Sequence, residues 1–281
     1  MRDAVCDVVE NRDLGGGVWL LRLRDPAMAA EMAPGRFVML QVGPDLAPTL
    51  RRPFSIQRCS GDVYDVLYRV VGVGTQLMAG LKPGDTVGAL GPMGNSFTPP
   101  APDERAILLG GGVGIPPMVA LAYDLLARGH EDFQAYVGVS SAQDAGCWVG
   151  FKDQLEDPRI TRATMDGSIG FAGHVVAAWR DRWQREGAPS KARVYACGPM
   201  VMLRAVELAA AELGVPAEVS VEAMMGCGMG ACMSCVIENK DAQDPVKRAA
   251  MSPYDRWLLA CRRGPVFATG TVVLDEGEFL H

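Results

Sequence analysis

The sequence predicts three parts: an N-terminal antiparallel β-barrel, a parallel α/β domain, and a small C-terminal segment organised by cysteines. Short apolar strands separated by proline and glycine fill the first hundred residues. From residue 105 onward, apolar runs alternate with helical patterns, and four cysteines gather beyond residue 226. We therefore expect the three parts to span residues 1–100, 101–215 and 216–281.

The barrel is predicted from three strand-like segments. Residues 17–23, 37–42 and 63–71 are rich in β-branched and aromatic side chains, and proline–glycine pairs separate them. Short strands with frequent turns are typical of a small closed barrel. The proline-rich stretch 98–103 cannot continue a sheet, so it is the expected domain boundary.

The second part has the pattern of a parallel sheet with helices. The continuous apolar run 106–109 is typical of a strand buried on both faces. Alternating helices and strands then follow, which predicts a parallel α/β layer. The expected elements are a helix over 117–127, strands over 135–139 and 193–196, and a helix over 201–213.

Four cysteines carry the strongest chemical signal, spaced as Cys227-x4-Cys232-x2-Cys235 with Cys261 further on. This is the plant-type spacing of 2Fe–2S ligands. Glycines between the first cysteines permit the backbone angles that such a loop needs. Structural zinc is an alternative, because Cys232-x2-Cys235 suits it, and disulfides are a third. We favour the cluster because zinc sites usually bring a second close cysteine pair.

Bulk properties exclude several classes of function. The chain has 281 residues and a net charge of −6, without a run of Lys or Arg. The length suits about two domains, and the charge argues against a nucleic-acid partner. The N-terminus lacks the apolar core of a signal peptide, and no stretch approaches the about 20 apolar residues of a membrane span. We expect a cytoplasmic protein.

Two glycine turns follow predicted parallel strands. The first, Gly110 to Gly114, lies between a buried strand and a helix, where backbone N–H groups can approach a pyrophosphate. It departs from a strict G-x-G-x-x-G, and a tight turn without a ligand is the alternative. The second turn is Cys197-Gly198-Pro199-Met200. Because nucleotide sites form at the carboxyl ends of parallel strands, we expect both turns at a dinucleotide site.

Two barrel segments could hold a second ligand. Arg52, at the end of the expected third barrel segment, could neutralise a phosphate, while Phe54 and Ser55 could flank and hydrogen-bond a flat ring. The loop Gly72-Val73-Gly74-Thr75 could admit phosphate or ribityl groups. A surface turn and a hairpin bend are the respective alternatives.

The motifs occur in an order that resembles the ferredoxin–NADP reductase superfamily, over essentially the whole chain. The motifs are Arg52-Pro53-Phe54-Ser55, Gly72-Val73-Gly74-Thr75, Gly91-Pro92-Met93-Gly94-Asn95, Gly112-Val113-Gly114-Ile115-Pro116 and Cys197-Gly198-Pro199-Met200. The cysteine segment narrows the resemblance to the electron-transfer subunits of NAD-dependent dihydroorotate dehydrogenases. The loop of 25 residues between Cys235 and Cys261 is longer than expected for that family.

The resemblance implies three cofactors: FAD in the barrel, NAD in the α/β domain, and a 2Fe–2S cluster held by Cys227, Cys232, Cys235 and Cys261. Cys197 would be the catalytic residue beside nicotinamide and flavin N5. The cofactor-binding residues implied are Arg52, Pro53, Phe54, Ser55, Gly72, Gly74, Thr75, Gly94, Asn95, Gly111, Gly112, Val113, Gly114, Cys197, Gly198, Pro199 and Met200. NAD is favoured over NADP because residues 140–144 hold no Arg or Lys for a 2′-phosphate.

The resemblance also implies a partner, an FMN-containing dihydroorotate dehydrogenase catalytic subunit in a heterotetramer. Electrons from dihydroorotate would pass through the cluster and FAD to NAD+, which would place the chain in pyrimidine biosynthesis. One alternative is a reductase subunit of a transhydrogenase, hydrogenase, sulfite reductase or oxygenase. The other is a zinc-binding module without redox activity.

Overall fold

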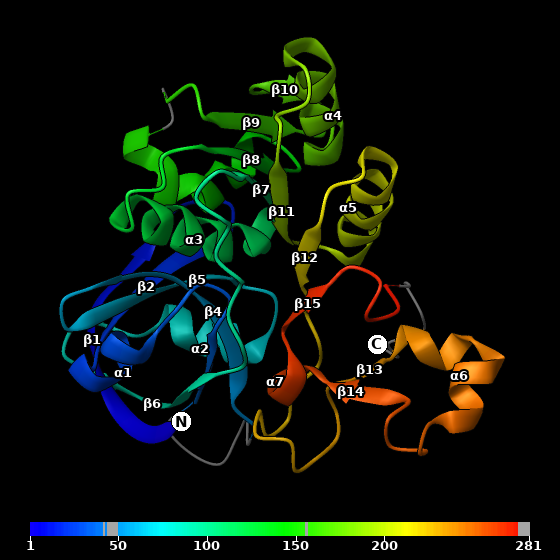
Figure 1. Ribbon diagram of the computed structural model, residues 1–281. Helices are drawn as coiled ribbons and strands as arrows, with labels where there is room; N and C mark the ends of the chain where they lie inside the picture. Colours follow the sequence, from blue (N-terminus) through cyan, green and yellow to red (C-terminus); the bar gives the residue numbers. More distant parts are fainter. Residues whose placement is uncertain (42, 44–49, 155–156, 275–281) are drawn as a thin grey trace.

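The computed structural model describes residues 1–41, 43, 50–154 and 157–274. A closed barrel, a seven-stranded sheet with helices and a C-terminal segment follow one another along the chain (Figure 1). This is the predicted fold class. None of the described helices is long and apolar enough to cross a membrane.

Six antiparallel strands close the barrel in the order β1-β2-β5-β4-β3-β6. Alternate side chains point inward and form one apolar core, to which Leu21, Leu23, Val38 and Val66 belong. Arg52 to Ser55 open strand β4, so the prediction that they end the third strand was wrong. The elements are β1 (Arg2–Asp13), β2 (Val18–Arg24), α1 (Pro26–Glu31), β3 (Phe37–Leu40), β4 (Arg52–Ser60), β5 (Val63–Arg69), α2 (Val73–Ala79) and β6 (Thr86–Met93).

The sheet has the order β10-β9-β8-β7-β11-β12-β15, and all neighbours are parallel except β12 and β15. Ile107 and Leu109 of β7 pack in one core with residues of α4 and α5. Ala106 and Leu108 pack on the other face with α3. The elements are β7 (Arg105–Gly111), η1 (Gly112–Gly114), α3 (Ile115–Ala127), β8 (Phe133–Val139), η2 (Ala142–Gln154), β9 (Ile160–Thr164), β10 (Phe171–Ala172), α4 (Val175–Glu186), β11 (Ala192–Cys197), α5 (Met200–Leu213), β12 (Ala217–Ser220) and β15 (Val266–Ala268).

The C-terminal segment contains more regular structure than its sequence pattern suggested. Strands β13 (Val236–Glu238) and β14 (Trp257–Leu259) pair as a small hairpin, and α7 (Ala260–Arg263) follows. The long loop holds η3 (Lys240–Gln243) and α6 (Pro245–Ala250). Asp244 begins α6 by accepting hydrogen bonds from two backbone N–H groups. Since β12 and β15 join the larger sheet, that sheet continues beyond residue 215.

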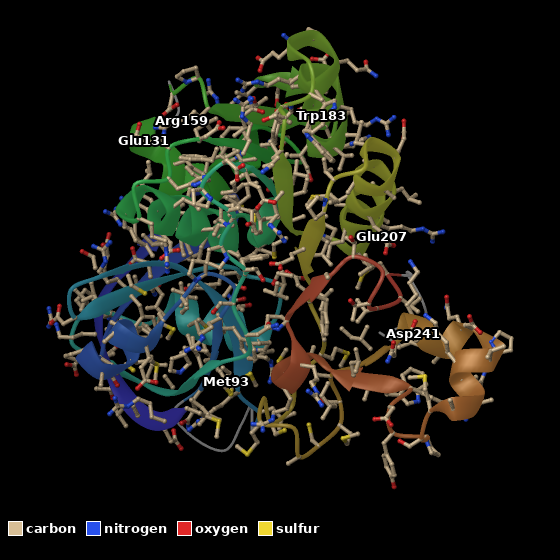
Figure 2. The ribbon with its side chains drawn as sticks, viewed as in Figure 1. Met93, Glu131, Arg159, Trp183, Glu207 and Asp241 are labelled. Carbon is tan, nitrogen blue, oxygen red and sulfur yellow. The ribbon has the colours of Figure 1, made fainter. Side chains whose placement is uncertain are left out.

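Polar contacts hold this segment against the rest of the molecule. Glu207 of α5 is labelled in Figure 2. Its carboxylate accepts from Lys240 Nζ at 3.0 Å and from the Gly270 N–H at 2.8 Å. Asn95, just beyond β6, donates to the Val266 carbonyl and accepts from the Val266 N–H. The cysteine-bearing segment is therefore fixed both to the sheet and to the barrel.

Candidate functional site

A first cavity, of about 500 Å³, lies where the barrel meets the larger sheet. The residues predicted to contact FAD line it: Arg52, Pro53, Phe54, Ser55, Gly72, Gly74 and Thr75. Val113 and Cys197 line it as well. The structure thus brings together residues from both predicted cofactor sites around one space.

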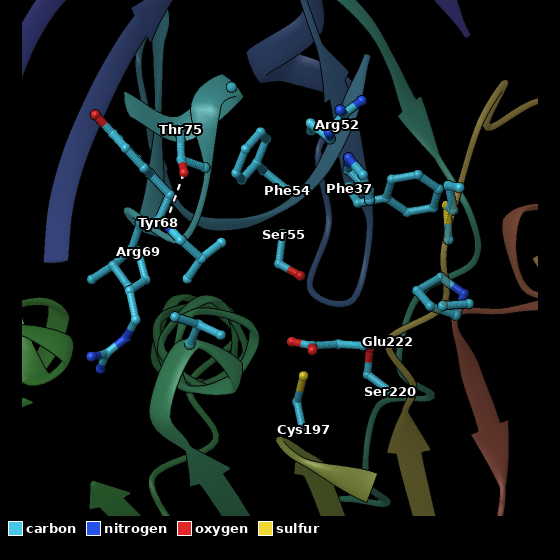
Figure 3. A pocket seen from close by; sticks show the side chains of 18 of the residues that line it. Phe37, Arg52, Phe54, Ser55, Tyr68, Arg69, Thr75, Cys197, Ser220 and Glu222 are labelled. Carbon is cyan, nitrogen blue, oxygen red and sulfur yellow. Dashed lines mark hydrogen bonds between the residues drawn. The ribbon is translucent and has the colours of Figure 1, made fainter. Parts of the chain in front are cut away.

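Strand β4 supplies an aromatic wall of the first cavity. In the ladder with β3, Phe54 and Ser55 pair with Val38 and Phe37. Phe54 also packs edge-on against Tyr68 of β5, with ring centroids 6.2 Å apart (Figure 3). A flat ring system can bury its apolar face against such a wall, so the wall fits the isoalloxazine of a flavin.

The loop before α2 is shaped by one hydroxyl group. Thr75 Oγ1 accepts from the backbone N–H groups of Val71 at 2.9 Å and Gly72 at 3.2 Å, and donates to the Gly72 carbonyl. Thr75 thereby fixes the loop that borders the first cavity. Across the cavity, the Arg52 guanidinium donates to the carbonyl of Leu50 at 2.7 Å. A guanidinium there fits the diphosphate of a dinucleotide.

The floor of the first cavity contains an acid that sequence reasoning missed. Glu222 lies beside Ser220 and Cys197, facing Ser55 (Figure 3). Burial raises the pKa of the Glu222 carboxyl. Burial also raises the pKa of the Cys197 thiol, and the nearby Glu222 raises it further. Glu222 comes two residues after a buried strand, which alone was too weak a signal to single it out.

A second cavity, of about 400 Å³, borders the first on the sheet side. Gly111, Gly112 and Pro199 line it, and Arg69 lines both cavities. Strands β7 and β11 are neighbours in register, which brings their two glycine turns together. A Cβ on Gly114 would lie 2.5 Å from the backbone of Cys197 and Gly198. The predicted nucleotide turns therefore form one packed unit.

Other predicted residues lie away from the cavity walls. Gly94 and Asn95 face residues 263–266, where a Gly94 Cβ would meet Pro265 and the Gly264 carbonyl. A Cβ on Gly198 would meet Met202, and Met200 begins α5 and packs partly against the core. Their roles in cofactor binding stay predictions.

The segment 140–144 acquires a basic neighbour from the barrel. Ser140 lines the second cavity, while Asp144 pairs with Arg69 Nη1 at 2.8 Å. The absence of Arg and Lys within 140–144 was therefore not a sufficient reason to favour NAD. A cation from β5, distant in sequence, folds against this turn.

The four predicted cluster ligands lie in one stretch of the C-terminal segment and in the helix α7 that packs against it. Cys235 Sγ and Cys261 Sγ are 3.2 Å apart. Cys227 Sγ accepts from the N–H groups of Ala231 at 3.3 Å and Cys232 at 3.4 Å. A close thiol pair, together with a third thiol that accepts backbone hydrogen bonds in the same loop, suits a two-iron cluster with four cysteine ligands. In the described part of the chain, no group of three or more metal-ligating side chains is already assembled, either for a cluster or for zinc.

The loop around these cysteines has the backbone that a cluster needs. Gly228, Gly230 and Met233 adopt positive φ values of 70°, 87° and 61°, which lets the chain curl around a compact core. A hydrogen bond from Ser234 lowers the pKa of the Cys232 thiol to about 6. Thiolates are the ligating form, so this environment fits iron binding.

The cluster loop begins at the first cavity and ends against the barrel. Ala223 and Met225, which precede Cys227, line that cavity together with Pro265. A Cβ on Gly228 would lie 2.5 Å from Met93 Cε and 2.7 Å from Met39 Cγ. The predicted flavin and cluster sites are therefore neighbours.

Comparisons with known proteins agree with this geometry. A family model described as the iron–sulfur cluster binding domain of dihydroorotate dehydrogenase B matches residues 222–273. The dihydroorotate dehydrogenase B (NAD(+)) electron transfer subunit of Desulforamulus reducens is 37% identical over 253 residues, covering 88% of this chain and 89% of that protein. The corresponding subunit of a Geobacillus species is 33% identical over 278 residues, covering 98% and 100%.

The chain belongs to this family of electron transfer subunits. Among solved structures, an NADH-dependent reduced ferredoxin-NADP oxidoreductase aligns with a TM-score of 0.78 and 25% identity, covering 97% of this chain and 91% of that one. An Amycolatopsis cytochrome P450 reductase aligns with a TM-score of 0.62 and 27% identity, covering 75% and 66%. The predicted cofactors FAD, 2Fe–2S cluster and NAD are supported. The alternatives, another redox complex or a zinc module, are not favoured.

Proposed function

We propose that the chain carries electrons between a catalytic subunit that oxidises dihydroorotate to orotate and NAD+. The first cavity carries this proposal, because the nucleotide turns border it on one side and the start of the cluster loop borders it on the other. Bound FAD supplies the exchange between hydride chemistry and the single-electron chemistry of the cluster. The chain's own residues hold these sites in adjacent positions.

We assign the protein groups as follows. Arg52 binds the FAD diphosphate, Phe54 and Ser55 contact the ring, and the loop 72–75 borders the ribityl and diphosphate side. The turns 111–114 and 197–200 receive the nicotinamide dinucleotide. Cys197 and Glu222 meet the nicotinamide end, where the raised pKa of the Glu222 carboxyl favours its protonated form more than an ordinary glutamate would.

The partner subunit is proposed to dock around the cluster loop. Cys232 is exposed, and Met229 and Met233 beside it are 44% and 46% exposed. Tyr254, Trp257 and two arginines line a hollow next to Met229. Aromatic residues, Met and Arg are enriched at protein interfaces. The electron donor in the partner subunit must also come close to the cluster, so the two subunits should meet at this loop. The unusually long loop would then enlarge the docking face.

Docking can be tested by sedimentation of the chain mixed with its catalytic subunit. The double variant Tyr254→Ala, Trp257→Ala should weaken association at least about tenfold, since buried aromatic anchors contribute about 2 kcal/mol or more. Leu208→Ala, which removes another exposed apolar side chain on α5, is the control. If the double variant and the Leu208→Ala control bind the catalytic subunit with equal affinity, the docking face would be removed from the proposal.

We also infer that the isolated chain is itself an NADH-oxidising enzyme when given an artificial acceptor, because the nucleotide and flavin sites lie within one polypeptide. A cytoplasmic location is proposed, since none of the eight cysteines is paired in a disulfide and unpaired cysteines persist in reducing compartments. The functional test is dihydroorotate-dependent NAD+ reduction by the reconstituted complex. NAD+ reduction by either subunit alone would contradict the relay. An inactive reconstituted complex would contradict it as well.

A further inference from the structure

Arg69 occupies the junction between the two cavities. It ends β5 and is among the residues lining both spaces. The glycine turn after β7 spans the same junction, because Gly112 lines the second cavity and Val113 lines the first. A nicotinamide dinucleotide that reaches from one cavity into the other must place its central diphosphate at this junction.

The charge of the two ligands calls for more than one cation. FAD and NAD+ each carry a diphosphate with two negative charges. Arg52 and Arg69 are the arginines among the described residues that line the first cavity, and Arg69 is the one that also lines the second. Arg52 lies on β4 on the barrel side, whereas the Arg69 side chain points away from Phe54 and Ser55 (Figure 3).

The present partner of Arg69 can be exchanged. Its Nη1 contacts Asp144 Oδ1 at 2.8 Å and the Gly16 carbonyl at 3.4 Å. Its Nη2 lies 3.9 Å from Cys147 Sγ. The Arg69 side chain is 32% exposed and that of Asp144 is 15% exposed, so the guanidinium is the accessible member of the pair. A diphosphate offers an arginine a bidentate, charge-assisted contact, whereas the contact with the Asp144 carboxylate runs from Nη1 to Oδ1.

We propose that Arg69 binds the diphosphate of the nicotinamide dinucleotide and exchanges Asp144 for it when the ligand enters. The inference rests on the proposed function, because it assumes that NAD+ spans both cavities. Asp144 is then a competitor that holds the guanidinium beside the nucleotide turn.

The test measures binding of NAD+, ADP-ribose and adenosine to the full chain loaded with FAD and cluster, by calorimetry. Arg69→Gln should weaken NAD+ and ADP-ribose by about tenfold to about a hundredfold, the effect of losing a hydrogen-bonded charge contact. Adenosine, which has no diphosphate, should bind unchanged. Arg69→Lys should recover part of the loss. Arg24→Gln, which breaks a surface pair with Asp62 on the barrel, is the matched control.

Asp144→Asn separates binding from a purely structural role. If Arg69 binds the diphosphate, this variant should bind NAD+ as tightly as the parent or up to about fivefold more tightly, because the competing ion pair is gone. If the pair only joins the barrel to the sheet, both variants should lose affinity for all three ligands equally, which would overturn the inference. The inference would also be overturned if the parent binds NAD+ and the Arg69→Gln variant binds it with the same affinity. Parent protein that binds no NAD+ would instead refute the proposed function.

Discussion

The contact between the cluster loop and the barrel gives a prediction that can be worked from the geometry. Gly228 has φ of +70°, and a Cβ there would lie 2.7 Å from Met39 Cγ and 2.5 Å from Met93 Cε. The terminal methyl group of Met93 can move aside, but Met39 is fully buried and its Cγ is close to the backbone. Gly228→Ala must therefore displace the loop or the barrel wall.

The loss of folding stability caused by Gly228→Ala has two components. A side chain in the left-handed region costs about 1–2 kcal/mol, and overpacking a buried contact costs about 1–3 kcal/mol more. Gly214→Ala isolates the first component, because Gly214 has φ of +66° and nothing within 4 Å of its Cβ position. We expect Gly228→Ala to be about 1–3 kcal/mol more destabilising than this control, and the loss to fall on the cluster loop.

The assay is iron and FAD content after gel filtration, followed by anaerobic reduction with NADH. Gly228→Ala should lose iron or reduce its remaining cluster more slowly, while its FAD content and NADH-dependent dye reduction stay at the level of the control. A variant with full iron content and an unchanged rate of cluster reduction would refute the view that this contact positions the loop.

Three further predictions test other parts of the site. Cys261→Ala should abolish the visible iron–sulfur absorption yet retain NADH-dependent dye reduction, because the flavin and nucleotide sites do not use this thiol; loss of both would contradict separate sites. Glu222→Gln should flatten the dependence of Tm on pH. The pKa of Glu222 is raised in the folded chain, so the parent loses stability as pH rises above the ordinary value of 4.5. A glutamine does not titrate and therefore removes this loss. Equal Tm differences between pH 5 and pH 8 in both proteins would refute this. Gly114→Ala places a Cβ 2.5 Å from the backbone of Cys197 and Gly198, so it should destabilise the chain by about 1–3 kcal/mol or more and slow NADH oxidation, and an unchanged Tm would show that the two turns separate easily.

The fold was largely predictable because its signals are local. The strand over 106–109 and the helix over 117–127 became β7 and α3, since a continuous apolar run and helical periodicity depend on neighbouring residues. The cysteine spacing is also a local signal, and the iron–sulfur domain that it predicted agrees with the family model over residues 222–273. Strand β4 was misplaced because Pro53 and two arginines obscure its alternation, although the ladder with β3 stabilises it.

What could not be predicted depends on contacts between distant segments. Glu222 becomes notable only when β12 carries it under Ser55 and beside Cys197. Arg69 lies beside the nucleotide turn through its contact with Asp144, which is 75 residues away in the sequence. The long loop before Cys261 has local caps at Asn239 and Asp244, but its position depends on Glu207 of α5.

The most direct test of the account is anaerobic mixing of the reconstituted complex, this chain with its catalytic subunit, with dihydroorotate in the presence of NAD+. The account predicts NADH formation that requires both subunits and is lost in Cys261→Ala, which leaves the FAD in place. NADH formation at the parental rate by the Cys261→Ala complex would show that electrons bypass the cluster, and would contradict the central claim.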